Sequence, residues 1–386
     1  MPIVSRYPID LILLALVTLI QAVGVRMLWR SAAARASERV RTAILAGTAV
    51  SFTILLLGVM IQRSGLAGAW PVWITTWGRG LIAAWALASS LAVAGLAIAR
   101  LIPARAHHSP SRRAFLHTTQ AALICAPVLA TGYGVFIQRH DFRLREQDIK
   151  ILNLPPDLDG LRMVQLTDIH LSPFLSLREL DHTIAMANET RAHVALVTGD
   201  LITRGDDPLD DCLEHLTRLR ADAGIFGCMG NHEIYAGVEA YTARRAAGLG
   251  IHFLRQQSEP LRFGSATLNL AGVDYQRIGK PYLPNAETLT RPDAFNVLLS
   301  HNPDVFPVAA RKGFPLTIAG HTHGGQIRFE ILRQDLSIVR FITPYYDGLY
   351  QENGSSIFVS RGIGTIALPA RLGAPPEVAL LRLCRT

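Results

Sequence analysis

Four long apolar stretches before residue 140 place the strongest constraint on how this chain can fold. They run over about 11–27, 43–61, 81–99 and 114–137, and the last contains no charged residue. A helix needs about 20 apolar residues to cross the hydrocarbon core of a bilayer. Three stretches meet this length, whereas the first is marginal because Asp10 lies at its edge and Gln21 inside it. We therefore expect about four transmembrane helices rather than buried core helices.

Arginines in the connecting loops predict how these helices are oriented. The loop after the first stretch carries five arginines between residues 26 and 41, and the loop after the third carries four between residues 100 and 113. Loops rich in Lys and Arg stay in the cytoplasm. The fourth stretch then delivers all later residues to the periplasmic or extracytoplasmic side of the cell (inner) membrane.

An arginine pair precedes the fourth stretch. The segment "SRRAFL" (111–116) resembles the pattern of twin-arginine export signals, and the run that follows it is only moderately apolar. This resemblance predicts a late internal signal that the twin-arginine translocation machinery recognises. Alternatively, the pair is ordinary cytoplasmic positive charge. Both interpretations place the following domain outside the cytoplasm.

Charge divides the chain at the same point. Residues 1–147 hold 15 arginines and four acidic residues, a net charge of +11, whereas residues 148–386 have a net charge of −3. A nucleic-acid-binding protein concentrates basic charge on its folded domain, so we exclude a nucleic-acid partner. We predict a membrane region over 1–147 and a separate folded domain over 148–386.

Within the second region, five short apolar runs each end in polar residues of one chemical type. The runs are "LRMVQL" before "TDIH", "HVALV" before "TGD", "GIFGCM" before "GNHE", "FNVLL" before "SH" and "LTIA" before "GHTHGG". Helical patterns follow over 176–190, 238–248 and 303–311. This alternation predicts an α/β or layered α+β domain. Strand ends in such sheets converge on one edge, where ligands bind.

Spacing within these motifs predicts a metal site. Residues two apart in an extended chain point to the same side, so both members of D-x-H and of H-x-H should reach one edge. Seven nitrogen or oxygen ligands are thereby predicted: Asp168, His170, Asp200, Asn231, His301, His321 and His323. One metal does not need seven protein ligands, whereas two metals that share Asp200 account for them. Mixed His, carboxylate and amide ligands suit Mn, Fe or Zn.

The five motifs in this order resemble the calcineurin-like metallophosphoesterase superfamily over roughly residues 148–386. The segments "VSRGIGT" (359–365) and "RLGAPPE" (371–377) are similar to its YkuE/YaeI-type phosphodiesterase branch. The resemblance implies an α+β fold in which helices flank a calcineurin-like β-sandwich, with a dimetal site at the strand ends. It also implies a metal-dependent phosphoric ester hydrolase, here anchored to the membrane.

The resemblance implies a role for each site residue. One metal takes Asp168, His170, Asp200 and His323, and the other takes Asp200, Asn231, His301 and His321. Two such ions clamp a phosphoryl group and lower the pKa of a shared water. His232 is expected to contact the phosphate and protonate the leaving oxygen, and Glu233 to orient His232. Arg204 and Arg361 are each expected either to neutralise phosphate charge or to be solvated.

The substrate expected from this reading is a phosphodiester or pyrophosphate in a cell-envelope lipid or polymer. Substrate selection is expected from loops 171–177, 202–209 and 234–238, in which Phe174, Leu175 and Tyr235 are either exposed or packed against neighbouring loops. Two alternatives stay open. One is a phosphomonoesterase or protein phosphatase on the same fold, and the other is a membrane sensor or scaffold with a vestigial site.

Overall fold

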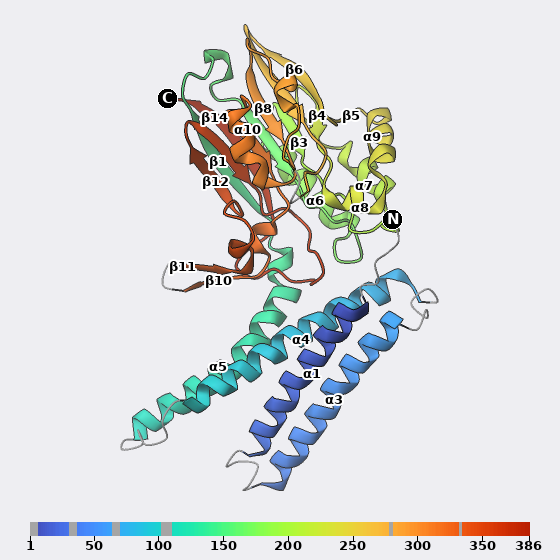
Figure 1. The fold of residues 1–386 in the computed structure, drawn as a ribbon, viewed down its shortest axis with the longest axis vertical. Coiled ribbons are helices and arrows are strands. Elements are labelled where there is room, and N and C mark those ends of the chain that lie inside the picture. Colours follow the sequence, from blue (N-terminus) through green and yellow to red (C-terminus); the bar gives the residue numbers. More distant parts are fainter. Residues whose placement is uncertain (1–6, 31–36, 64–69, 102–109, 278–280, 332–333) are drawn as a thin grey trace. The chain divides into compact units, whose positions relative to one another are not determined.

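The computed structural model describes residues 7–30, 37–63, 70–101, 110–277, 281–331 and 334–386 (Figure 1). The chain divides into two compact units, Met1–Val135 with Ala367–Pro369, and Phe136–Ile366 with Ala370–Thr386. The boundary predicted from the sequence, between residues 147 and 148, lies within strand β1 (Arg143–Ile151).

The first unit is built from long helices. They are α1 (Tyr7–Trp29), α3 (Glu38–Arg63), α4 (Val72–Leu101) and α5 (Pro110–Phe136). Among the described residues, three segments are long and apolar enough to cross a membrane: Glu38–Leu57, Val72–Leu101 and Ala121–His140. The described apolar part of α1, Ala15–Trp29, is shorter. The structure therefore supports three candidate spans, where the sequence predicted about four.

Gln21, which makes the first stretch marginal, joins three helices of this unit. Its Nε2 donates a hydrogen bond to Oγ of Ser89 at 2.9 Å, and its Oε1 accepts one from Oγ of Ser51 at 2.7 Å. The indole Nε1 of Trp85 donates to the same Ser51 oxygen at 2.9 Å. Polar groups that pair between apolar helices hold them together, so Gln21 has a packing role between α1, α3 and α4.

Two six-stranded sheets form the second unit. The first has the order β1, β14 (Glu377–Arg385), β2 (Arg162–Leu166), β3 (Val194–Val197), β4 (Ile225–Gly227) and β5 (Ile251–Phe253). The second has the order β12 (Gly348–Glu352), β13 (Ser355–Val359), β9 (Leu316–Ala319), β8 (Phe295–Leu299), β7 (Ala266–Gly272) and β6 (Gln257–Phe263). Strands β2 to β5 run parallel, as do β7, β8, β9 and β13. A short hairpin, β10 (Arg328–Ile331) and β11 (Gln334–Ser337), completes the strands.

The two sheets share one apolar core. Met163 and Leu196 of the first sheet and Val297, Ile318 and Phe358 of the second are fully buried in one cluster. Helices α6 (Leu177–Glu189), α7 (Leu209–Leu216) and α9 (Glu239–Gly248) contribute to a cluster with β2 and β3. Helix α10 (Phe306–Arg311) contributes to another with β7 and β8. This mixed α/β arrangement of two sheets with helices confirms the fold predicted for the domain.

Helix α6 shows how local sequence fixes an element boundary. The sequence predicts a helix over 176–190. Ser176 is the N-cap, its Oγ accepting a hydrogen bond from the Glu179 backbone N–H while the Glu179 carboxylate accepts one from the Ser176 N–H. Such a capping box satisfies two donors that a helix start leaves unpaired. The helix thus begins directly after the loop that follows β2.

The four cysteines are free thiols. Cys212 and Cys228 are buried, Cys384 is half-buried and Cys125 is exposed. Cys212, Cys228 and Cys384 therefore form no disulfide with one another, a point that the sequence leaves open.

Candidate active site

Adjacent strands bring the five motifs to one edge of the sandwich. The parallel neighbours β2, β3 and β4 lead into "TDIH", "TGD" and "GNHE", and the parallel neighbours β8 and β9 lead into "SH" and "GHTHGG". Ligand atoms of six predicted residues fall into clusters that can hold a metal: Asp168, His170, Asp200, His301, His321 and His323. Asn231, the seventh, lies at the first position of α8 (Asn231–Ala236), directly after the β4 strand end.

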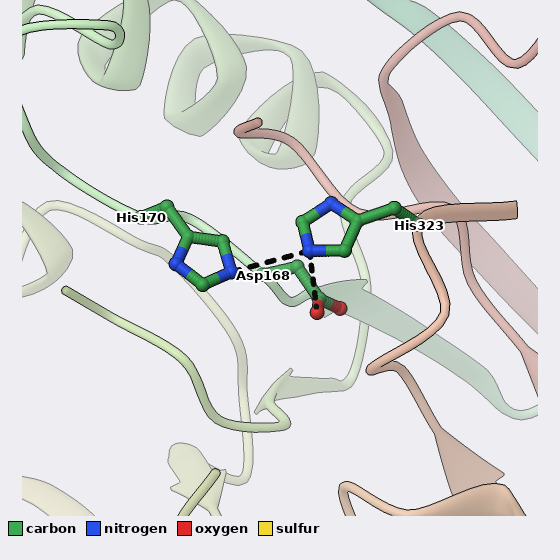
Figure 2. A group of neighbouring side chains, drawn as sticks. All are labelled: Asp168, His170 and His323. Atoms are coloured by element: carbon green, nitrogen blue, oxygen red, sulfur yellow. Dashed lines mark hydrogen bonds and ion pairs between the residues drawn. The ribbon is translucent and has the colours of Figure 1, made fainter. Parts of the chain in front are cut away.

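Asp168, His170 and His323 form the first cluster, which we call the enclosed group (Figure 2). His170 Nε2 lies 3.2 Å from His323 Nε2, and His323 Nε2 lies 3.4 Å from Asp168 Oδ1. All three side chains are at most 5% exposed. Two imidazole nitrogens and a carboxylate that converge in a buried space are a donor set that suits a divalent transition metal.

Asp200, His301 and His321 form a second cluster, which we call the open group because His321 is only partly buried. Asp200 Oδ2 lies 3.0 Å from His301 Nε2, although the two are not aligned as a hydrogen bond. The same oxygen lies 3.5 Å from His170 Nε2. One carboxylate oxygen therefore lies between a histidine of each group.

Asn231 tests whether these residues fit a metal. Its Oδ1 is buried and has no hydrogen-bond donor among the described residues. A buried carbonyl oxygen without a partner costs about 1–3 kcal/mol, and a cation is the partner that the surrounding imidazoles and carboxylates favour. His301 Nε2 is also buried without an aligned hydrogen-bond partner in the described chain. The residues present fit a pair of divalent metal ions.

The backbone reaches this geometry in a way that the sequence did not predict. We expect extended chain at D-x-H and H-x-H, yet φ is +50° at Asp168, +46° at His170, +75° at His321 and +52° at His323. Asp200 has φ of +54°. Left-handed conformations cost non-glycine residues about 1 kcal/mol or more and persist where the surroundings impose them. The paired side chains therefore converge through left-handed turns, and the expectation of extended chain is wrong.

Hydrogen bonds to the second ring nitrogen orient the metal-facing histidines. His301 Nδ1 lies 2.7 Å from the carbonyl oxygen of Thr198, so Nδ1 carries a proton and Nε2 is the nitrogen that faces the other ligands. His170 Nδ1 lies 3.2 Å from Oγ1 of Thr203. Such contacts fix the tautomer and the ring plane of a metal ligand.

Arg371 is a buried residue of the site that the sequence analysis missed. Its guanidinium is fully buried and donates to the backbone oxygens of Gly364, His323, Arg361 and Ala374, and its Nη2 lies 3.2 Å from Nδ1 of His323. Burial and Arg371 together lower the pKa of His323. The motif "RLGAPPE" marked a family branch, but residue type alone predicts a solvated arginine. Arg371 is a positioning residue for His323.

Glu233 contacts a different part of the site than expected. Its carboxylate accepts hydrogen bonds from the backbone N–H groups of Asp200 at 3.0 Å, Leu201 at 2.7 Å and Gly230 at 2.9 Å. Within the described residues, no hydrogen bond joins this carboxylate to the His232 ring. Glu233 instead fixes the turn that carries Asp200, and Asp200 Oδ1 accepts from the His232 backbone N–H at 2.9 Å.

His232 borders both groups. Its Nδ1 lies 2.7 Å from the carbonyl oxygen of Thr203 and therefore carries the proton, which leaves Nε2 free. The His232 ring meets the His170 ring edge-on, with centroids 4.8 Å apart. A ring nitrogen of His232 also clusters with ligand atoms of His170 and Asp200. An imidazole at this position can reach a group that is bound between the two clusters.

Burial and neighbouring charges set which site residues carry protons. Burial lowers the pKa of His170 to about 3 and of His321 to about 4, so both are the neutral imidazoles that metals require. Burial also acts to lower the pKa of His301, but the charges of Asp200 and Asp168 outweigh it and raise that pKa to about 10. Burial raises the pKa of Asp168 to about 6. A cation that binds His301 must displace its proton.

The remaining predicted positions are solvated or packed. Arg204 pairs with Asp206 at 3.0 Å, and both are about half exposed. Of the three apolar loop residues, Phe174 and Leu175 are buried at 8% and 4% exposure, whereas Tyr235 is 62% exposed. The sequence left open whether these side chains are exposed or packed, and Phe174 and Leu175 are packed.

Arg361, the other arginine candidate, is part of an ion-pair network. Arg361 forms two hydrogen bonds of 3.0 Å with the carboxylate of Asp347, from Nε and Nη2. Arg145 and Arg328 bind the same carboxylate. Arg361 is therefore paired with a carboxylate, whereas the sequence left open whether it neutralises phosphate or is solvated.

Comparison with known proteins agrees with the site. Residues 161–325 match the family model described as calcineurin-like phosphoesterase. The chain is 30% identical over 293 residues to the uncharacterized metallophosphoesterase YkuE of Bacillus subtilis, an alignment that covers 72% of this chain and 98% of YkuE. The chain belongs to the calcineurin-like phosphoesterase family. It is thus a metal-dependent phosphoesterase, and its apolar helices indicate a membrane protein.

Two further relatives extend this likeness. The transmembrane protein with metallophosphoesterase domain of Danio rerio is 29% identical over 276 residues, which cover 67% of this chain and 61% of that protein. The uncharacterized metallophosphoesterase Cj0846 of Campylobacter jejuni is 30% identical over 243 residues, 62% of this chain and 63% of the relative. The chain spans about three fifths of the length of these two relatives.

Proposed function

We propose that this chain is a membrane-anchored phosphodiesterase with two divalent metal ions. The observation that carries the proposal is the position of Asp200 Oδ2, 3.0 Å from His301 of the open group and 3.5 Å from His170 of the enclosed group. The unpaired Oδ1 of Asn231 supports it. Asp200 is then the shared ligand, Asp168, His170 and His323 complete one metal site, and Asn231, His301 and His321 complete the other.

The protein's own residues divide the chemical work. When bound, two such ions polarise the phosphoryl group and acidify a water. His232 Nδ1–H donates a hydrogen bond to the Thr203 carbonyl, which leaves Nε2 as the nitrogen that faces the site. In the imidazolium form, Nε2–H would transfer its proton to the leaving oxygen and His232 would return to the neutral ring. Glu233 and Arg371 hold the turns that carry Asp200 and His323. The protein thus supplies a general acid, His232, and residues that hold the metal ligands in position, Glu233 and Arg371.

We infer that the scissile bond is a phosphodiester or pyrophosphate in an envelope lipid or polymer. The similarity of segments 359–365 and 371–377 to the YkuE/YaeI-type branch supports this assignment over a monoesterase. Comparing kcat/KM of the full chain for bis(p-nitrophenyl) phosphate and p-nitrophenyl phosphate tests it, with His232→Ala as the inactive control. We expect a clear preference for the diester. A preference for the monoester would favour a phosphomonoesterase, and activity confined to phosphopeptides a protein phosphatase.

The topology belongs to the same proposal. We propose four membrane crossings, with α1 as the first, and a catalytic domain on the periplasmic or extracytoplasmic side of the inner membrane. The positive-inside distribution of arginines supports this orientation. The motif 111–116 falls in the first turns of α5, and the side chains of Arg112 and Arg113 lie outside the described residues.

One reporter fusion and one double substitution test the orientation and the export route. A reporter joined after Thr386 should report the non-cytoplasmic side. Replacing Arg112 and Arg113 with Lys should block export of the domain while the earlier helices stay inserted. Export that survives the double change would reject the twin-arginine machinery as a partner and leave the orientation intact.

A further inference from the structure

A groove of about 360 Å³ adjoins the metal-facing histidines. It is bordered by the 3-10 helix η8 (Ile338–Phe341), and we call it the η8 groove. Its walls include His321 and His323 together with four aliphatic side chains: Ile338, Val339, Ile342 and Ile366. A molecule that occupies this groove is therefore in contact with the same loop that carries two predicted metal ligands.

The η8 segment is packed directly onto that loop. Gly325 of "GHTHGG" has φ of +83°, and a Cβ at this position would come within 2.1 Å of Oγ of Ser337. Only glycine permits such a close approach. At the other end of η8, Oγ1 of Thr343 donates to the carboxylate of Asp304. The groove is thus a built continuation of the active site.

Apolar surface is exposed at the mouth of the groove. Ile338 is 81% exposed, Phe341 is 92% exposed and Ile342 is 65% exposed. Three large apolar side chains within five residues leave a patch that is unfavourable in water. Contiguous exposed apolar patches mark binding sites for apolar partners.

Charge in the groove restricts what can occupy it. Of the described residues that line it, Asp304 is the only carboxylate and none is Lys or Arg. A second phosphate, as in a nucleoside diphosphate, would face this carboxylate without a cation to pair with. A hydrocarbon chain needs no such partner, and each methylene that leaves water favours its binding.

We propose that the η8 groove binds the hydrocarbon chain of the substrate, which is therefore a membrane lipid that carries its phosphoester close to an alkyl or acyl chain. This inference rests on the proposed phosphodiesterase function. The same chain supplies three helices suited to a bilayer, and only residues 137–142 separate α5 from β1. Six residues span at most about 20 Å, so a bilayer that holds α5 keeps the domain near its lipids.

A matched pair of diesters tests the proposal on the full chain in one detergent. The substrates are 4-nitrophenyl octyl phosphate and 4-nitrophenyl ethyl phosphate, which differ only in chain length. We expect kcat/KM at least about tenfold higher for the octyl ester. In Ile338→Ser/Ile342→Ser, the octyl to ethyl ratio should fall to within about threefold of unity. Both side chains are mostly exposed, so this change should preserve the fold.

A surface control and a binding measurement make the outcome decisive. Leu144→Ser/Leu152→Ser changes two exposed leucines of the β1 region and should keep the wild-type octyl to ethyl ratio. Partition of the substrates into micelles affects all proteins equally, because they are assayed in one detergent. An equal kcat/KM for both esters in the wild type, or an unchanged ratio in the groove variant, would overturn the proposal. If neither ester is cleaved, the phosphodiesterase function fails. Calorimetric binding of octylphosphonate and ethylphosphonate then tests the groove alone, with the same expected ratios.

Discussion

The enclosed and open groups of the site differ in how the protein supports them. In the enclosed group, His323 is held by the buried guanidinium of Arg371, and His170 Nδ1 by Thr203. In the open group, His301 is held by one backbone carbonyl, while Asn231 Oδ1 has no partner among the described residues and His321 borders the η8 groove. In the proposed two-metal arrangement, one position is thus prebuilt by protein contacts, and the other is left for a cation and a substrate to complete.

Removing Asp200, whose carboxylate lies near a histidine of each group, should have the largest effect. Asp200→Asn weakens a ligand of both positions, so turnover should fall about a thousandfold or more, because each metal supplies several kcal/mol to the transition state. Metal content, measured by mass spectrometry on the purified full chain, should fall in parallel. A fully active Asp200→Asn protein would reject the shared-ligand arrangement.

His232 lies beside both groups and is expected to bind neither metal. His232→Ala should lower kcat by about 10²- to 10⁴-fold, the usual contribution of a general acid, with metal content near that of the wild type. His252→Ala, which alters an exposed histidine of β5, is the control and should leave both values unchanged. Loss of metal from His232→Ala would instead make His232 a ligand.

Arg371 tests whether protein contacts hold the enclosed group in place. Arg371→Met removes the guanidinium donor from four backbone oxygens, of which that of His323 keeps the Gln326 N–H, and this should lower the free energy of unfolding by about 3 kcal/mol. It should also weaken one metal site by about 10- to 100-fold, and Arg371→Lys should restore part of both. Chemical denaturation and metal titration measure the two effects. Arg382→Met, at an exposed arginine paired with Asp148, should change neither, and an equal effect there would reject the positioning role.

Asn231 is the matching test on the open side. Asn231→Ala removes a buried oxygen that has no partner among the described residues, so the unfolding free energy measured in EDTA should not fall and should rise by up to about 1–3 kcal/mol. Metal affinity at one site should nevertheless fall. Asn296→Ala is the contrast, because Asn296 Oδ1 accepts two hydrogen bonds and its loss should cost about 1–3 kcal/mol. A large loss of stability from Asn231→Ala would make Asn231 a structural residue.

Asp347 provides a test of charge that lies outside both groups and should leave metal binding unchanged. Burial alone would raise its pKa, but Arg361, with Arg145 and Arg328, lowers it to about 2. Because the folded pKa is below the unfolded value of 3.8, the stabilisation is complete above pH 4 and is lost as the pH falls towards 2. We expect Asp347→Asn to be less stable by up to about 2 kcal/mol at pH 5, with the difference shrinking below pH 4. Acid denaturation monitored by circular dichroism measures this, and a constant difference would refute the charge assignment.

Much of the site could be predicted because strand ends converge. The order of motifs after β2, β3, β4, β8 and β9 was enough to collect the metal-facing residues, since parallel neighbours end at one edge. The left-handed turns at Asp168 and His323 could not be predicted, because short-range spacing assumes extended chain. Arg371 was missed since its burial depends on long-range contacts with segments around residues 323 and 364. The η8 groove was missed for the same reason.

Metal stoichiometry tests the two-group arrangement most directly. Mn²⁺ titrated into the EDTA-treated full chain, followed by isothermal calorimetry, should show two ions per chain with unequal affinity. His323→Ala should lose the tighter ion, since the enclosed group is held in place before metal binds, and His321→Ala should lose the weaker one. One ion per chain in the wild type, or loss of the same ion in both variants, would contradict two metal positions that share Asp200.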